Sequence, residues 1–167
     1  MNRSPVVIGL GAVVALQFFV LSGMVVKAAM PLWTGTEIRV RTVPVDPRSM
    51  FRGNYAELNY EIGQLPNNAL SDSTSLRIGE IVYVSLKLGE NGLYRFKDVS
   101  LHKPAEGIFL RGRIVDNQPP YRVEYGIEAF FAPKTKALQL EKDLRNGGVA
   151  VLMVTGGGRV ALNDVVP

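Results

Sequence analysis

The sequence predicts a mainly β protein in which a single N-terminal transmembrane helix precedes a compact antiparallel β-barrel or sandwich-like domain with one short helix. Two observations support this fold class. Residues Pro5–Val26 contain no charged side chain, and a helix of that length crosses the hydrocarbon core of a bilayer, about 30 Å. About eight short β-prone segments separated by turn residues follow, which is typical of an all-β domain. We therefore expect an anchor over residues 1–28, a linker over 29–35 and a β domain over 36–167.

The composition fits a folded domain with one apolar anchor and argues against several classes of protein. Of the 167 residues, 47% are hydrophobic and 20% are charged, with a net charge of +4. This small, dispersed charge does not favour nucleic-acid binding, which needs a clustered basic face. The chain has no cysteine and one histidine, His102, which excludes disulfides, thiol nucleophiles and multi-histidine metal sites. We expect no cofactor.

The apolar segment leaves two interpretations open. A retained anchor is favoured because the run is longer than the apolar region of a usual signal peptide, but Val26-Lys27-Ala28 loosely fits the rule for a cleavage site. Lys27, Arg39 and Arg41 favour a cytoplasmic domain by the positive-inside rule. We prefer a periplasmic domain, because a short basic tail before an uncharged run resembles an uncleaved secretion signal. Trp33, in the expected linker, would lie at the headgroup level or make a core contact.

The β domain begins with a strand over Thr36–Val43, where Ile38, Val40 and Thr42 alternate with charged residues. Pro44 and Pro47 then remove two backbone donors and interrupt the ladder. A turn follows, in which Asp46 can accept backbone hydrogen bonds and Gly53 can adopt a positive φ. Beyond it, the alternating residues predict a half-buried strand with one face formed by Ala56, Leu58, Tyr60 and Ile62.

The remaining elements follow the same alternation. Residues 63–77 are predicted to form an exposed loop, and the chain then returns to strands with turns at Glu90–Gly92 and Gly156–Gly158. One helix is predicted over Lys134–Arg145, because its apolar residues recur at helical spacing and Asn146-Gly147-Gly148 stops it. The further strands are predicted over Glu80–Leu88, Leu93–Leu101, Gly107–Val115, Tyr121–Phe131, Val149–Thr155 and Arg159–Leu162.

The spacing Gly53-Asn54-Tyr55-x-x-Leu58-x-Tyr60 resembles the signature of the GDYXXLXY family of membrane-anchored bacterial proteins. Segments 45–48, 51–52, 109–113 and 125–131 are similar too, so the resemblance covers roughly the whole chain after the apolar segment. It implies an anchor in the bacterial inner membrane and a domain found next to multi-pass membrane proteins, without implying a reaction. Asn54 stands where the family pattern has Asp, so an acid-dependent role is not carried over to this position.

Arginine and tyrosine gather around the turn, and these residue types are enriched at the energetic centres of interfaces. One hypothesis is structural: Arg48 or Arg52 pairs with Asp46 or Glu57 and pins the turn to the sheet. The other is a docking surface for a multi-pass membrane protein or an anionic ligand, to which Arg111 and Arg113 would add charge. The candidate binding residues are Asp46, Arg48, Arg52, Gly53, Asn54, Tyr55, Leu58 and Tyr60.

The enzymatic alternative is a membrane-anchored serine hydrolase. Ser49-Met50 followed by Gly53-Asn54 is similar to type I signal peptidases, in which a serine nucleophile is activated by a desolvated lysine. Lys87 and Lys97 are available, but neither lies in a lysine-arginine box, so a turn serine is favoured. We expect no metal site, because the possible oxygen ligands do not form a calcium loop. Those ligands are Asp46, Glu57, Glu61 and Asp72.

Overall fold

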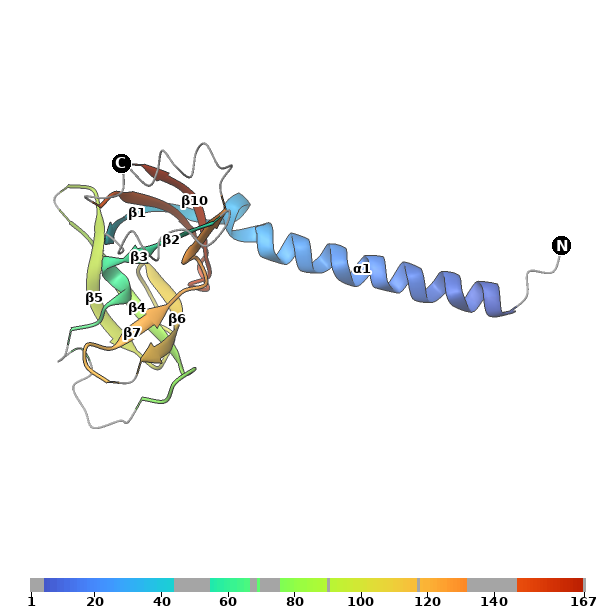
Figure 1. The fold of residues 1–167 in the computed structure, drawn as a ribbon, viewed down its shortest axis with the longest axis horizontal. Coiled ribbons are helices and arrows are strands. Elements are labelled where there is room, and N and C mark those ends of the chain that lie inside the picture. The colour runs from blue at the N-terminus through green and yellow to red at the C-terminus, as the bar shows by residue number, and fades with distance from the viewer. Residues whose placement is uncertain are drawn as a thin grey trace.

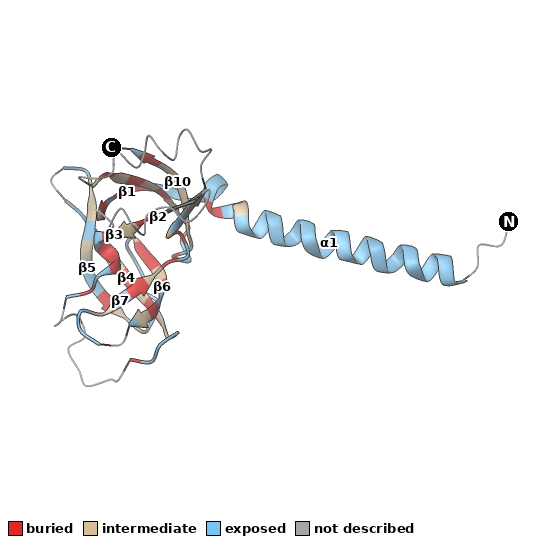
Figure 2. Cartoon of the chain, in the orientation of Figure 1, coloured by how far each residue is buried: buried red, intermediate tan, exposed pale blue. Residues whose placement is uncertain are grey.

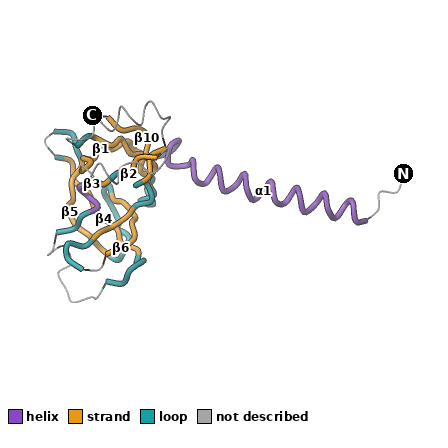
Figure 3. Tube along the Cα trace, in the orientation of Figure 1, coloured by secondary structure: helices purple, strands orange, loops and turns teal. Residues whose placement is uncertain are grey.

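The computed structural model describes residues 5–43, 55–66, 69, 76–89, 91–116, 118–131 and 147–166. A long N-terminal helix projects like a rod from a β domain, which is a curled, mixed sheet (Figure 1). Figure 3 shows that strands dominate the domain. The predicted mainly β fold behind one N-terminal helix is therefore confirmed. The helix predicted over Lys134–Arg145 lies outside the described residues.

The helix α1 covers Pro5–Thr34, and a short 3-10 helix η1 covers Glu61–Gly63. In the main sheet the strand order is β10-β9-β1-β5-β4-β6-β7, with β3 beside β1, while β2 and β8 form a separate pair. Among the described strand pairs, β1 and β5 run parallel and the others run antiparallel. The strands are β1 Thr36–Val43, β2 Tyr55–Glu57, β3 Asn59–Tyr60, β4 Ile81–Leu88, β5 Tyr94–Ser100, β6 Phe109–Asp116, β7 Arg122–Glu124, β8 Ala129–Phe131, β9 Val149–Val154 and β10 Val160–Val166.

Helix α1 extends beyond the predicted anchor and takes in most of the residues expected to form a linker. Its last turn is closed by the backbone N–H of Gly35, which donates to the carbonyl of Pro31 at 2.9 Å. Gly35 is required there, because a Cβ at this position would lie against the Pro31 carbonyl and 2.9 Å from the Val154 nitrogen. Trp33 is 70% exposed, so its alternative role as a core contact is wrong. The helix thus joins β1 through one residue, with its end against β9 and β10.

The core lies inside the curl of the sheet, as the red segments of Figure 2 indicate. The alternation predicted for β1 and β4 is confirmed over the middle of each strand, since the buried residues are Ile38, Val40 and Thr42 in β1 and Val82, Val84 and Leu86 in β4. Thr42 is the buried polar exception, and its hydroxyl donates to the Gly148 carbonyl at 3.0 Å and accepts from the Gly148 N–H at 2.8 Å. The largest fully buried side chains come from several elements and are Ile38, Ile62, Leu65, Leu110, Ile114 and Leu152.

Two hairpins confirm the predicted turns. Strands β4 and β5 are joined through Gly92, whose φ is +73°, and β9 and β10 through Gly158, whose φ is +75°. Strand β10 continues to Val166 rather than ending at Leu162, because a bulge accommodates Asn163 and restores the pairing at Asp164. The alternation in the sequence breaks at that bulge, which is why the prediction ended early.

Candidate functional site

The structure separates the predicted binding residues into three groups. Tyr55 begins β2 and pairs through its backbone with Phe131. Leu58 and Tyr60 are only 4% and 3% exposed, so both side chains belong to the core. The others lie outside the described residues, together with the candidate nucleophile Ser49, and are Asp46, Arg48, Arg52, Gly53 and Asn54.

The segments that carry the family resemblance around Tyr60 and Tyr125 lie side by side. Residues 55–65 run antiparallel to residues 121–131, and we call this pair the signature ribbon. At one end Tyr55 faces Phe131, and at the other the Leu65 N–H donates to the Tyr121 carbonyl at 2.9 Å. Because β3 pairs with β1 and β7 pairs with β6, the ribbon connects two distant strands of the curled sheet.

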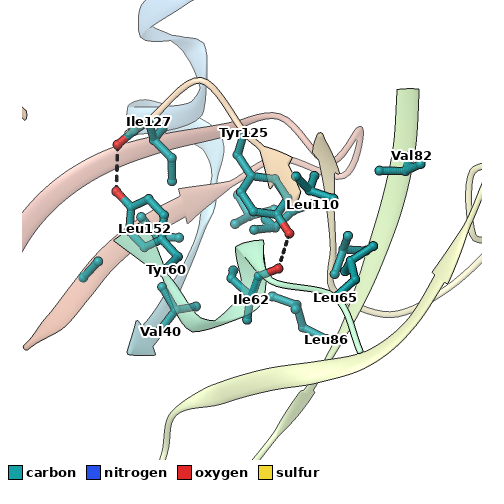
Figure 4. Close-up of a cluster of buried hydrophobic side chains, with 14 of the residues drawn as sticks. Val40, Tyr60, Ile62, Leu65, Val82, Leu86, Leu110, Tyr125, Ile127 and Leu152 are labelled. Carbon is teal, nitrogen blue, oxygen red and sulfur yellow. Dashed lines mark hydrogen bonds between the residues drawn. The ribbon is translucent and has the colours of Figure 1, made fainter. Parts of the chain in front are cut away.

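Two buried tyrosines cross the middle of the ribbon in opposite directions (Figure 4). The Tyr60 hydroxyl donates to the Ile127 carbonyl at 2.7 Å, and the Tyr125 hydroxyl donates to the Ile62 carbonyl at 2.6 Å. Each hydroxyl therefore satisfies a buried carbonyl of the opposite segment of the ribbon. The Leu58 N–H adds a backbone bond to the Glu128 carbonyl at 2.7 Å.

Glu128 explains why the predicted strand over Tyr121–Phe131 is interrupted. Its carboxylate accepts from the N–H groups of Tyr125 at 2.6 Å and Gly126 at 2.9 Å. The chain turns there, since the φ of Gly126 is +83°, a region that glycine adopts without steric cost. Opposite this turn the signature strand also breaks, into β2, β3 and η1, so the prediction of two continuous strands is wrong at the same place in both.

Burial raises the pKa of the Tyr60 and Tyr125 phenols above the ordinary value of 10.0, and the negative charge of Glu128 raises it further. Both groups are therefore neutral hydrogen-bond donors. The family resemblance in the sequence includes the segment Tyr125–Glu128, but the sequence predicts no role for these residues. A signal was present, because a tyrosine, a glycine and an acid within four residues form a turn that can cap its own backbone.

The second feature is a cleft of about 730 Å³ between the end of α1 and the outer face of β6. We call it the junction cleft. The four cations Lys27, Arg111, Arg113 and Arg159 line it, and Glu124 is the acidic residue among the described residues of its wall. The alternation of a strand predicts that Arg111 and Arg113 lie on one face, but no local sequence pattern predicts that Lys27 and Arg159 lie near them.

The described residues offer little for the enzymatic alternative. Lys87 and Lys97 are both exposed, whereas a lysine that serves as a base must be desolvated. Within the described part of the chain, no three acidic or histidine side chains gather as a metal site would require. Of the possible oxygen ligands, Glu61 is exposed on η1, and Asp46 and Asp72 lie outside the described residues.

Comparison with known proteins gives one match. The model of the family described as GDYXXLXY protein matches residues 17–165, nearly the whole chain, and begins inside α1. No curated protein and no solved structure matches the chain.

Proposed function

This chain belongs to the GDYXXLXY protein family, and from that premise we propose that it is a single-pass membrane-anchored accessory protein that docks on a multi-pass membrane partner. The anchor inserts in the inner membrane of a bacterium and places the β domain on the periplasmic side. The proposed docking surface is the segment before β2, which lies outside the described residues, together with Tyr55. No observation on the described residues favours a hydrolase built on Ser49.

The exposure of α1 is the observation that carries this proposal. The helix has 30 residues and a mean hydropathy of 2.3 over its most apolar stretch, none of which is buried against the domain. An exposed apolar surface of this extent needs lipid or another protein to cover it. The uncharged stretch Pro5–Val26 is about 33 Å long at 1.5 Å per residue, which matches the thickness of the hydrocarbon core of a bilayer.

The junction between helix and domain supports an accessory role. Gly35 alone separates α1 from β1, and Pro31 is the buried residue of the helix. A domain attached this closely remains at the bilayer surface, within reach of lipid headgroups and the loops of neighbouring membrane proteins. The proposed contact residues are Asp46, Arg48, Arg52, Gly53, Asn54 and Tyr55, while the buried Leu58 and Tyr60 would support that surface from the core.

Site-specific photocrosslinking in the native membrane tests the docking proposal. A photoreactive residue at Arg52 or Tyr55 is expected to capture a multi-pass membrane protein, and one at the exposed Lys87 is the matched control. Replacing Asp46, Arg52 and Tyr55 together should reduce recovery of that partner without unfolding the domain. Equal crosslinking from Lys87, or unchanged recovery with the triple variant, would contradict the docking surface.

The anchor and its orientation have separate tests. The intact mass of the membrane-extracted chain should include residues 5–26, whereas a cleaved signal peptide would remove them. A C-terminal alkaline phosphatase fusion should be active, because that enzyme folds on the periplasmic side. An inactive but stably expressed fusion would place the domain in the cytoplasm.

A further inference from the structure

We propose that the junction cleft binds the anionic phosphodiester headgroup of a membrane phospholipid. This inference rests on the proposed membrane anchor and concerns a site different from the proposed docking segment. The occupant follows from three properties of the cleft: its height relative to the bilayer, its excess of positive charge, and the apolar side chains at its edge.

The height follows from the helix. Met24, Lys27, Ala28 and Pro31 contribute to the cleft, and their spacing places them on one face of α1. Lys27 is the first charged residue after the apolar stretch that begins at Pro5. With that stretch in the hydrocarbon core, Lys27 lies at the level of the headgroups, and the cleft opens at the same level.

The charge comes from three separate segments that the fold assembles. Arg111 and Arg113 lie on the same face of β6, and the Arg113 guanidinium donates to the Gly79 carbonyl at 3.0 Å. The turn that carries Arg159 is fixed against β6, because the Arg111 N–H donates to the Gly158 carbonyl at 2.8 Å. These hydrogen bonds hold the Arg113 side chain and fix the β9–β10 turn beside β6, so the fold brings both sources of arginine to the same cleft.

Little negative charge offsets these cations. Glu124 is already paired with Arg122, with 3.1 Å between Nη2 and Oε1. Within the described part of the chain, no carboxylate lies within ion-pairing distance of Lys27, Arg111, Arg113 or Arg159. Guanidinium groups bind phosphate oxygens in pairs, so this set suits a phosphodiester.

Part of the cleft wall is apolar, which favours a lipid over a soluble anion. Ile78 is 69% exposed although it is a large hydrophobic residue, and it lines the cleft together with Met24 and Val160. These side chains would contact the glycerol and the first methylenes of a lipid bound by its phosphate. The volume of about 730 Å³ lies within the usual range of ligand sites.

Native mass spectrometry of the full-length chain in mixed micelles tests the inference. The probe is phosphatidylglycerol, with phosphatidylcholine as the zwitterionic comparison. The wild type should retain phosphatidylglycerol preferentially, and Arg111→Gln/Arg113→Gln/Arg159→Gln should lower its affinity by about fivefold per cation, or about a hundredfold in total. The matched control Lys87→Gln/Arg95→Gln/Lys97→Gln removes three exposed charges on β4 and β5 and should retain the lipid.

Equal retention of both lipids by the wild type, or equal losses in the two triple variants, overturns the inference. Displacement of phosphatidylglycerol by millimolar inorganic phosphate also overturns it, because the site would then belong to a soluble anion. The variant Phe18→Trp/Trp33→Phe separates this failure from failure of the anchor, because its one tryptophan lies within the apolar stretch. If α1 spans the bilayer, brominated lipids of either headgroup quench that tryptophan; absence of quenching by both contradicts the anchor itself.

Discussion

The signature ribbon and the junction cleft use polar side chains in opposite ways. In the ribbon, Tyr60 and Tyr125 are buried, and each hydroxyl donates to a backbone carbonyl of the opposite segment. In the cleft, Arg111 and Arg159 lie apart from any described carboxylate and face an open volume. The difference indicates that Leu58 and Tyr60 of the family signature serve the fold, and it leaves the cleft as the proposed place for a ligand.

The largest expected effect is on the core of the ribbon. Leu58→Ala removes a buried side chain and leaves a cavity, which should lower the free energy of unfolding by about 2–5 kcal/mol. Leu88→Ala is the matched control, because Leu88 is 62% exposed and should change little. Urea unfolding of the detergent-solubilised chain, followed by circular dichroism, measures both. Similar small losses in the two variants would contradict a structural role for Leu58.

The second-largest effect is expected from alkaline pH, which should lower the free energy of unfolding. The folded state holds the phenolic protons of Tyr60 and Tyr125 more tightly than the unfolded state, since their pKa values are raised. Above the unfolded pKa of about 10, the unfolded state binds fewer protons, so stability falls as pH rises. At pH 11 each tyrosine should cost about 1.4 kcal/mol relative to neutral pH.

The double variant Tyr60→Phe/Tyr125→Phe is the control for this titration, because it keeps every other ionisable side chain of the protein. Its stability should fall less between pH 9 and pH 11 than that of the wild type. Identical pH profiles in the wild type and the double variant would show that the two phenols ionise as easily in the folded chain as in the unfolded one.

The two hydroxyls should also contribute at neutral pH, by a smaller amount. Tyr60→Phe or Tyr125→Phe removes one buried hydrogen bond, which should cost about 0.5–1.5 kcal/mol. The two bonds join the same pair of segments, so a double-mutant cycle should give a coupling energy of at least about 0.5 kcal/mol. Strict additivity in urea unfolding would mean that the two tyrosines act independently.

Local pattern predicted the strands that alternate without interruption. In β1 and β4 the period of two is regular, and burial follows it from Ile38 to Thr42 and from Val82 to Leu86. The sequence alone also carries the family resemblance, because the signature is a fixed spacing around Tyr60. Turn residues such as Gly92 and Gly158 located the hairpins, since a positive φ is a local requirement.

The features that escaped prediction depend on contacts between distant residues. The break in residues 121–131 requires Glu128 to cap the turn and Tyr125 to reach Ile62, 63 positions away in the chain. Helix α1 continues past Val26 because its last turn is stabilised by contact with the domain, which outweighs the unfavourable Pro31. The junction cleft draws on α1, β6 and the β9–β10 turn, and no single stretch of sequence contains it.

The smallest expected effect on stability comes from the cleft, and it sharpens the contrast with the ribbon. Arg111→Gln/Arg113→Gln/Arg159→Gln removes three side chains that form no described ion pair, so the urea midpoint should remain close to that of the wild type. Removing like charges that line one cleft should partly offset the lost bond from Arg113 to Gly79. Measured without added lipid, the midpoint reports on the fold alone; with phosphatidylglycerol, the wild type should gain stability that the variant lacks, since a ligand stabilises the state that binds it. A large loss of stability without lipid would mean that these arginines, like the tyrosines of the ribbon, serve the fold.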